Sequence, residues 1–152
     1  EKVGETKYKL ESLVNQGLSY VFGNDLRIAI ESAFKNNKTV FSLNIIKDGL
    51  SEGRASSFGG GVLAVVAILL RVSAIIITNS ERFIFLDESS NFVSAQYQPA
   101  LGNFLKQICG QLGFTIVLIS HQETINQSAD ISYTAQGDPV DGIKFVRDER
   151  GL

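Results

Sequence analysis

The chain opens with apolar residues at helical spacing. Between residues 8 and 22, apolar side chains recur every three or four positions, a period that predicts an amphipathic helix. Gly23 and Asn24 follow, a pair typical of a helix end. We therefore expect a helix from about residue 8 to residue 22, with its core face formed by Leu10, Leu13, Val14, Leu18, Val21 and Phe22.

The pattern then changes to alternation over two short stretches. Apolar and polar residues alternate from Leu26 to Glu31 and again from Phe41 to Ile45, and the turn-forming run Lys-Asn-Asn-Lys at 35–38 lies between them. Two alternating stretches joined by a short turn predict an antiparallel hairpin. We expect another turn at residues 48–49, and a polar loop from there to residue 57.

Continuous apolar runs replace the alternation in the second half of the chain. Residues 61–74 predict a helix buried on all sides, and residues 83–86 and 114–119 predict strands covered on both faces. Between the two strands, residues 97–112 predict an amphipathic helix that ends at Gly113. The order strand, helix, strand indicates a βαβ unit with a parallel pair.

A short helix or loop is expected after His121, and two more strands near residues 131–135 and 143–146. These elements predict the α/β class, with a parallel sheet core flanked by helices and a small antiparallel element. The sequence shows no internal repeat, so we expect residues 1–152 to form a single domain.

Composition adds few constraints. Hydrophobic residues make up 44% and charged residues 20%, as in ordinary globular proteins. The net charge of −2 gives no basic excess that would by itself indicate nucleic-acid binding. The single cysteine, Cys109, excludes an internal disulfide and fits a reducing, cytoplasmic compartment. We expect it to pack within a helix rather than to react.

The stretch from Gly61 to Ile77 is the part of the chain that suggests a membrane span. Arg71 and Ser73 interrupt its apolar run, whereas a span needs about 20 apolar residues and a central arginine is costly there. A helix in the core of a globular domain is the better interpretation.

Two carboxylates close the first apolar strand. Asp87 and Glu88 would lie at the carboxyl end of that strand, where ligands bind in open α/β sheets. Adjacent carboxylates can divide the work there: one holds Mg²⁺, usually through water, and the next accepts a proton from an attacking water. The alternative is two solvated acids at the start of a loop.

His121 is the only histidine, and it follows the second apolar strand. Parallel strands joined by one helix have their carboxyl ends at the same edge of the sheet. We therefore expect His121 at the same edge as the acid pair, where it can hydrogen-bond a phosphate oxygen and the water. A structural histidine is the alternative.

A glycine-rich loop, Ser-Ser-Phe-Gly-Gly-Gly at 56–61, leads into the apolar helix. Glycines let backbone N–H groups approach an anion closely, and a helix N-terminus favours negative charge. The spacing is not that of the dinucleotide-binding G-x-G-x-x-G. A flexible linker or a helix cap is the alternative.

The order of these motifs resembles the C-terminal lobe of SMC-like ABC ATPase heads. That class includes chromosome-segregation proteins, RecN and the SbcC-type repair ATPases. The resemblance covers about residues 8–135 and implies the fold of a P-loop ATPase head. It also implies that residues 1–23 form the base of a coiled-coil helix that re-enters the head.

The resemblance implies a role for the glycine loop. Ser57, Gly59, Gly60 and Gly61 would form the signature loop, which contacts the γ-phosphate of ATP held by a second head. The family's signature usually reads Leu-Ser-Gly-Gly followed by a polar residue. Here Phe58 fills the serine position and Gly61 the polar one.

The resemblance also implies roles for the strand ends. Residues 83–88 would be the Walker B strand, with Asp87 at Mg²⁺ and Glu88 as the general base. His121 would be the switch histidine. Residues 89–94 would be the D-loop, which here lacks the family's usual aspartate.

The phosphate-binding motif G-x-x-x-x-G-K-[ST] is absent, and the sequence contains no Gly-Lys pair. The family places that motif before a long coiled coil. This chain therefore resembles the part after the coil, and the Walker A lobe is expected on the same or another chain. A start at Glu1 rather than Met fits a fragment.

The resemblance implies a function in full. An SMC-like head dimerises on ATP and couples hydrolysis to DNA repair, recombination or chromosome maintenance. Its cofactors would be ATP and Mg²⁺, and its partners the Walker A lobe, a second head, DNA and a nuclease subunit, in the cytoplasm or at the nucleoid. The full-length protein would be an ATPase, and this chain alone inactive.

Two alternatives remain open. One is a non-hydrolysing interaction module that keeps the fold, and the other is the ATP-binding subunit of a membrane transporter.

Overall fold

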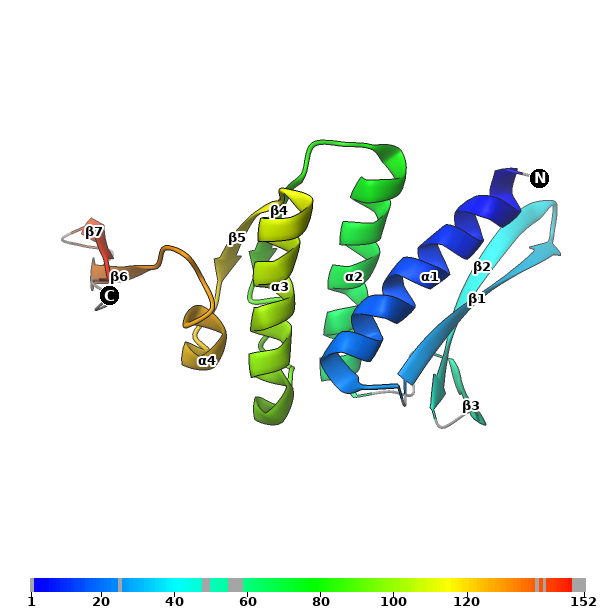
Figure 1. Cartoon of the computed structure of the whole chain (residues 1–152), viewed down its shortest axis with the longest axis horizontal. Coiled ribbons are helices and arrows are strands. Elements are labelled where there is room, and N and C mark those ends of the chain that lie inside the picture. Colours follow the sequence, from blue (N-terminus) through cyan, green and yellow to red (C-terminus); the bar gives the residue numbers. More distant parts are fainter. Residues whose placement is uncertain are drawn as a thin grey trace.

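The computed structural model describes residues 2–24, 26–47, 50–54, 59–138, 140 and 142–148, and its elements form an elongated row (Figure 1). In chain order they are α1 (Lys2–Phe22), β1 (Leu26–Lys35), β2 (Lys38–Lys47), β3 (Leu50–Arg54), α2 (Gly60–Thr78), β4 (Phe83–Asp87), the 3₁₀ turn η2 (Ala95–Tyr97), α3 (Gln98–Leu112), β5 (Thr115–Ile119), α4 (Glu123–Asn126), β6 (Tyr133–Asp138) and β7 (Gly142–Arg147). The α/β class is confirmed, with a parallel pair and antiparallel elements.

The first three strands form an antiparallel sheet in the order β1-β2-β3. The predicted hairpin is confirmed, and Asn36 and Asn37 turn it with φ of 50° and 59°. Both residues have positive φ, as a two-residue hairpin turn of type I′ requires. The prediction of a polar loop after the hairpin is wrong for residues 50–54, because these residues form strand β3, which pairs with β2. The predicted turn at 48–49 lies outside the described residues.

Helix α1 begins earlier than predicted and packs against the free edge of β1. Asn15 donates from Nδ2 to the carbonyl of Ile28 at 3.1 Å and accepts the Ile28 N–H at 2.7 Å. Glu11 accepts the N–H of Ile30. Side chains of α1 therefore satisfy backbone groups on the edge of β1 that pairs with no strand among the described residues.

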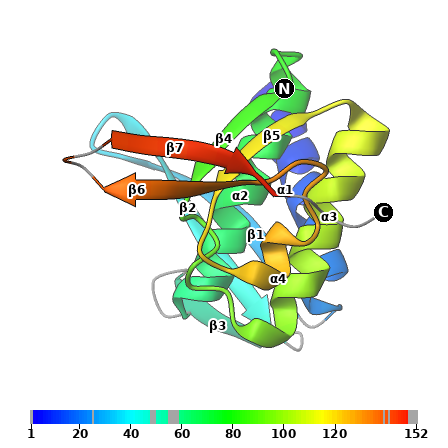
Figure 2. The ribbon, with the colours of Figure 1, turned by 90° about the vertical axis from the view of Figure 1, so that its left-hand side faces the viewer.

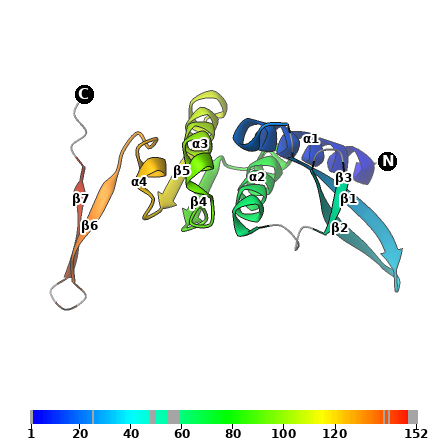
Figure 3. The ribbon, with the colours of Figure 1, turned by 90° about the horizontal axis from the view of Figure 1, so that it is seen from below.

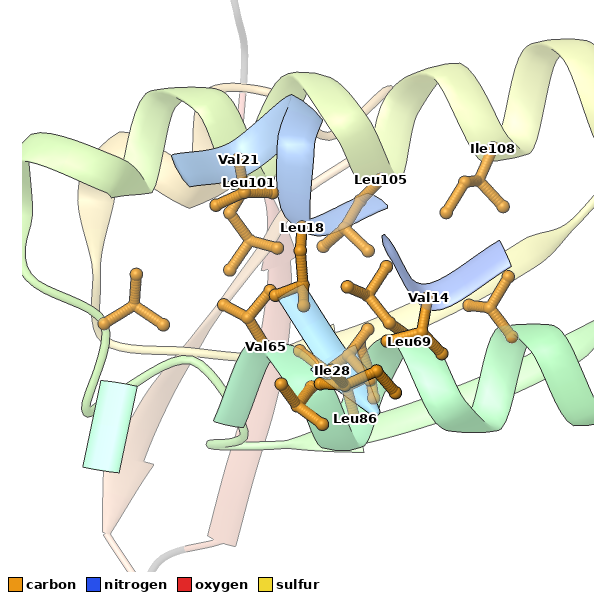
Figure 4. Close-up of a cluster of buried hydrophobic side chains, with 14 of the residues drawn as sticks. Val14, Leu18, Val21, Ile28, Val65, Leu69, Leu86, Leu101, Leu105 and Ile108 are labelled. Atoms are coloured by element: carbon orange, nitrogen blue, oxygen red, sulfur yellow. The ribbon is translucent and has the colours of Figure 1, made fainter. Parts of the chain in front are cut away.

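The hydrophobic core lies where four helices, α1 to α4, meet strands of the β1-β2-β3 sheet and of the β4-β5 pair (Figure 4). An edge-to-face contact joins Phe22 of α1 to Tyr97 of η2, with the ring centroids 4.7 Å apart. The fully buried centre of this core consists of Val14 and Leu18 from α1, Ile45 from β2, Val65, Ile68 and Leu69 from α2, Leu86 from β4, Leu101 from α3 and Ile125 from α4.

Helix α2 was predicted to be buried on all sides, and this is wrong. One face is buried in the core, whereas Ala67, Arg71 and Ala74 are exposed. By length and composition α2 could cross a membrane. One such helix is weak evidence for a membrane span, because core helices of soluble proteins meet the same criteria of length and composition. The buried face of α2 packs against α1.

Strands β4 and β5 pair in parallel, in register from Phe83↔Thr115 to Asp87↔Ile119. Helix α3 covers one face of the pair, and no described helix or strand covers the other (Figure 3). The prediction that both faces are covered is therefore wrong for this chain. The open face carries four half-exposed apolar side chains, Phe83, Phe85, Val117 and Ile119, and the exposed polar residues Asp87 and Thr115 alternate in phase with them.

The predicted C-terminal strands are present as an antiparallel hairpin, β6–β7, which projects from the body (Figure 2). Every residue of its two strands is exposed. Ser132 and Thr134 donate hydrogen bonds to the Asp148 carboxylate across its base. An isolated hairpin of this kind is only marginally stable in water.

Candidate functional site

The predicted site residues lie at the carboxyl ends of β4 and β5 and at the start of α2. In Figure 1, β4 and β5 start near the top and run downward, and α2 begins at its lower end. The first residues of α2 contact the loop that follows β4. The structure therefore brings Glu88 and His121 together, and it places the start of α2 against Phe92 and Val93 of the loop that follows Glu88.

The acid pair lies at the end of β4. Asp87 is the last residue of the strand and is exposed. Glu88 continues the parallel ladder by donating its N–H to the carbonyl of Ile119 at 3.0 Å, and then turns the chain with a φ of 47°. A positive φ is uncommon for a residue other than glycine and costs free energy. The turn directs Glu88 away from the line of the strand.

His121 lies beside Glu88. Its Nε2 is 3.2 Å from Glu88 Oε1, with 84% of the histidine side chain and 49% of the glutamate side chain exposed. Because both side chains are so exposed, their attraction contributes at most about 1 kcal/mol to stability. The pair is thus open to a ligand rather than a structural element of the core.

The glycine loop is described from Gly59 onward, and Ser57 and Phe58 lie outside the described residues. Gly59 is the N-cap of α2, with no side chain to cap the helix. A Cβ on Gly61 would lie 2.5 Å from the carbonyl oxygen of Phe92. Glycine at position 61 therefore allows the helix start to pack directly on the loop after β4. The first N–H groups of such a helix have no intrahelical acceptor and favour an anion.

The loop after β4, residues 88–94, is folded on itself and held from two sides. Asn91 N–H donates to the carbonyl of Glu88 at 3.1 Å. Gln98 of α3 donates to the carbonyl of Val93 at 3.0 Å, and Gln122 donates to the carbonyl of Asn91 at 3.2 Å. Sequence reasoning missed Gln122, because a glutamine after a histidine carries no motif that identifies it.

The site offers a small set of oxygen ligands for a metal. Among the described residues, no group of three or more His, Cys, Asp or Glu could hold a metal ion by itself. Mg²⁺ does not need such a group, because it keeps several waters and binds through one or two carboxylates and substrate phosphates. The exposed carboxylate of Asp87 fits that requirement.

Two other features lie away from this site. Burial and the nearby Asp130 carboxylate raise the pKa of the Cys109 thiol, which therefore stays protonated and poorly nucleophilic at neutral pH. An apolar hollow of about 480 Å³ between α1 and the β1–β2 hairpin is lined by Leu10, Ile30 and Phe41. Neither feature contacts the strand ends.

Comparison with known sequences finds no matching family model and no matching curated protein. Comparison with solved structures finds SMC heads. One is a chain from a study of ATP-driven dimerisation and DNA-stimulated activation of SMC ATPases, with a TM-score of 0.79, 10% identity, and coverage of 97% of this chain and 88% of that one. The SMC head domain from Thermotoga maritima matches with a TM-score of 0.66, 18% identity, and coverage of 98% and 51%.

A third similar structure is an Smc head domain with an extended coiled coil, bound to the C-terminal domain of ScpA and derived from Pyrococcus furiosus. It matches with a TM-score of 0.73, 11% identity, and coverage of 92% of this chain and 34% of that one. The chain thus spans about half or less of the second and third head chains. At these identities the likeness establishes the fold. The chain has the fold of a lobe of an SMC-type ATPase head.

Proposed function

We propose that this chain is the C-terminal lobe of an SMC-like ATPase head that dimerises on ATP and couples hydrolysis to DNA repair, recombination or chromosome maintenance. The observation that carries this proposal is the contact of Glu88 with His121 at the carboxyl ends of β4 and β5, with the glycine start of α2 packed on the loop that follows Glu88. The proposal covers residues 1–152 as one domain, with residues 1–23 at the base of a coiled coil.

In this proposal each exposed group has one task. Glu88 accepts a proton from the water that attacks the γ-phosphate, and His121 hydrogen-bonds that phosphate and the water. Asp87 holds Mg²⁺, which when bound offsets the negative charge of the phosphates. The exposure of Glu88 and His121 supports these tasks, because a nucleotide held by the Walker A lobe of the same head and the glycine loop of a second head can both reach these side chains.

The glycine loop acts on the nucleotide of the partner head. Ser57, Gly59, Gly60 and Gly61 close over the γ-phosphate held by that head. The open N-terminus of α2 supports this role, because its N–H groups and the helix dipole favour an anion. A second head is therefore needed to complete each ATP site.

The open face of β4–β5 supports a Walker A lobe as the missing partner. Parallel sheets are normally covered on both faces, yet Phe83, Phe85, Val117 and Ile119 remain half-exposed. The sequence has no phosphate-binding Gly-Lys motif, and the matched heads that this chain spans only in part are about two to three times its length. A lobe carrying that motif, on the same or another chain, would cover this face.

Other partners rest on the family resemblance. DNA is one, a nuclease subunit is another, and the cytoplasm or nucleoid is the location that suits both. The two alternative functions make different predictions: a non-hydrolysing module would show no turnover, and a transporter subunit would need membrane-spanning partners.

Measurement of ATP turnover in the full-length protein tests the proposal. Glu88→Gln keeps the size of the side chain but cannot take a proton, so turnover should fall by about a hundredfold to ten-thousandfold. Glu81→Gln is the matched control, because Glu81 is also exposed and precedes the same strand. Equal turnover in the Glu88 variant and the control would reject the proposed base.

A further inference from the structure

Residues 89–94 join the two halves of the candidate site. Glu88 directly precedes this segment and contacts His121. In the middle, the Gln122 side chain donates from Nε2 to the carbonyl of Asn91 at 3.2 Å. Gln122 directly follows His121, so this hydrogen bond ties the loop after β5 to the loop after β4.

The loop also meets the glycine start of α2. The ideal Cβ of Gly61 would lie 2.5 Å from the Phe92 carbonyl oxygen and 3.2 Å from Val93 Cα. Val93 is 3% exposed, so the segment that receives this contact is packed into the body. Gly61 therefore packs closely on backbone atoms of the 89–94 segment and leaves no room for a side chain.

The segment and its two neighbours Glu88 and Gln122 contain several energetically unfavourable features. Among the described residues, the two buried side-chain oxygen atoms without a hydrogen-bond partner belong to Ser90 and Gln122. Glu88, which directly precedes the segment, has a φ of 47°. Unpaired buried polar atoms and left-handed non-glycine residues are unfavourable, and they tend to occur where function rather than stability fixes the structure.

We propose that Gln122 is a positioning residue whose hydrogen bond to Asn91 holds the 89–94 segment in place. Through this segment, contact of the glycine loop with the nucleotide of the partner head positions the Glu88–His121 pair to hydrolyse the nucleotide of its own head. The inference rests on the proposed function. It adds a link, through Gly61, Phe92, Asn91 and Gln122, between the glycine loop and the hydrolytic pair of the same head.

The test uses Gln122→Met in the full-length protein. Methionine keeps the length of the side chain but removes both the donor to Asn91 and the unpaired buried oxygen. Loss of one positioning hydrogen bond should lower kcat by about tenfold, with the KM for ATP changed less than about twofold. The Tm should hold or rise, because an unpaired buried oxygen is removed. A fall in Tm with unchanged kcat would show a merely structural role and overturn the inference.

Gln111→Met is the matched control, because Gln111 is exposed on α3 away from the segment. Its kcat and Tm should equal those of the unmodified protein. A tenfold loss of kcat in this control as well would mean that the effect does not come from the Asn91 contact.

A double-mutant cycle tests the link to the glycine loop. Gly61→Ala forces the Phe92 carbonyl to move and should lower kcat. If Gln122 and Gly61 act through one segment, kcat of the double variant falls by less than the product of the fold-changes in the two single variants. Independent, multiplicative losses would overturn the link.

The outcomes separate this inference from the proposed function. If the full-length protein hydrolyses ATP and Glu88→Gln abolishes turnover, but Gln122→Met is fully active, only the inference fails. If the full-length protein shows no turnover that depends on Glu88, both fail.

Discussion

Glu88 and His121 face each other across the ends of two parallel strands, with 3.2 Å between Oε1 and Nε2. Glu88 reaches this position because the chain turns at a positive φ directly after β4. Both side chains are largely exposed, so their contact contributes little to stability. An exposed acid and histidine held together at the ligand-binding edge of a sheet are suited to act on a bound phosphate.

His121→Ala in the full-length protein should lower turnover more than it weakens ATP binding. Loss of one hydrogen-bond donor to a transition state costs about 10²–10³-fold in kcat. The Tm should change little, because the His121 side chain is 84% exposed. Kinetics beside thermal unfolding separate this result from that of a structural histidine, which would lower Tm and leave kcat unchanged.

This chain by itself should not bind ATP tightly. A phosphate loop supplies most of the phosphate contacts in such enzymes, through its backbone N–H groups and its lysine, and this sequence has no Gly-Lys pair. Calorimetric titration with ATP and Mg²⁺ should show no binding tighter than about 1 mM. Micromolar binding would mean that the chain holds a complete nucleotide site.

The order of elements could be predicted from the sequence, and the surroundings of the strands could not. Asn36 and Asn37 identify the hairpin turn because they tolerate positive φ. Strand β3 was missed because Leu-Ser-Glu-Gly-Arg has no strand pattern of its own and is ordered by pairing with β2. The apolar run at 83–86 predicts a covered strand, but a sequence cannot say whether the cover lies within the same chain.

The candidate site was predicted in part. Asp87, Glu88 and His121 lie at one edge of the sheet, as parallel pairing requires. The direct contact of Glu88 with His121 depends on the backbone turn at Glu88, and the role of Gln122 depends on a tertiary hydrogen bond. Neither leaves a signal in one sequence. The catalytic and binding roles of these residues stay predictions.

The hydrogen bonds from α1 to β1 should make Asn15 important for stability. Asn15→Ala removes both bonds to Ile28 and leaves its N–H and carbonyl part-buried and unpaired. Such losses cost about 1–3 kcal/mol in the free energy of unfolding. Urea denaturation measures this cost, with Asn103→Ala on the exposed side of α3 as the control. A control that costs as much as Asn15→Ala would contradict the assignment.

Side chains on the open face of β4–β5 should contribute to the free energy of unfolding only when the Walker A lobe is present. Phe85 is 53% exposed in this chain, so Phe85→Ser should hardly change the stability of the chain alone. If the Walker A lobe covers this face in the full-length protein, as we propose, the same change should cost about 2–4 kcal/mol there in the free energy of unfolding.

Phe34→Ser is the control for Phe85→Ser, since Phe34 is 72% exposed on β1, outside the open face. Chemical denaturation of both variants in both forms of the protein provides the comparison. An equal cost of Phe85→Ser with and without the other lobe would show that nothing docks on this face.

The central claim is that two heads close on ATP and that Glu88 drives the hydrolysis that opens them. Glu88→Gln should leave nucleotide binding largely intact, because in the proposed function the phosphate loop, Mg²⁺ and the opposing glycine loop hold the nucleotide. The slow variant should therefore accumulate the closed state. Light scattering of full-length Glu88→Gln should show the mass of a dimer with ATP and of a monomer without it. Bound nucleotide with no ATP-dependent change in mass would contradict the claim.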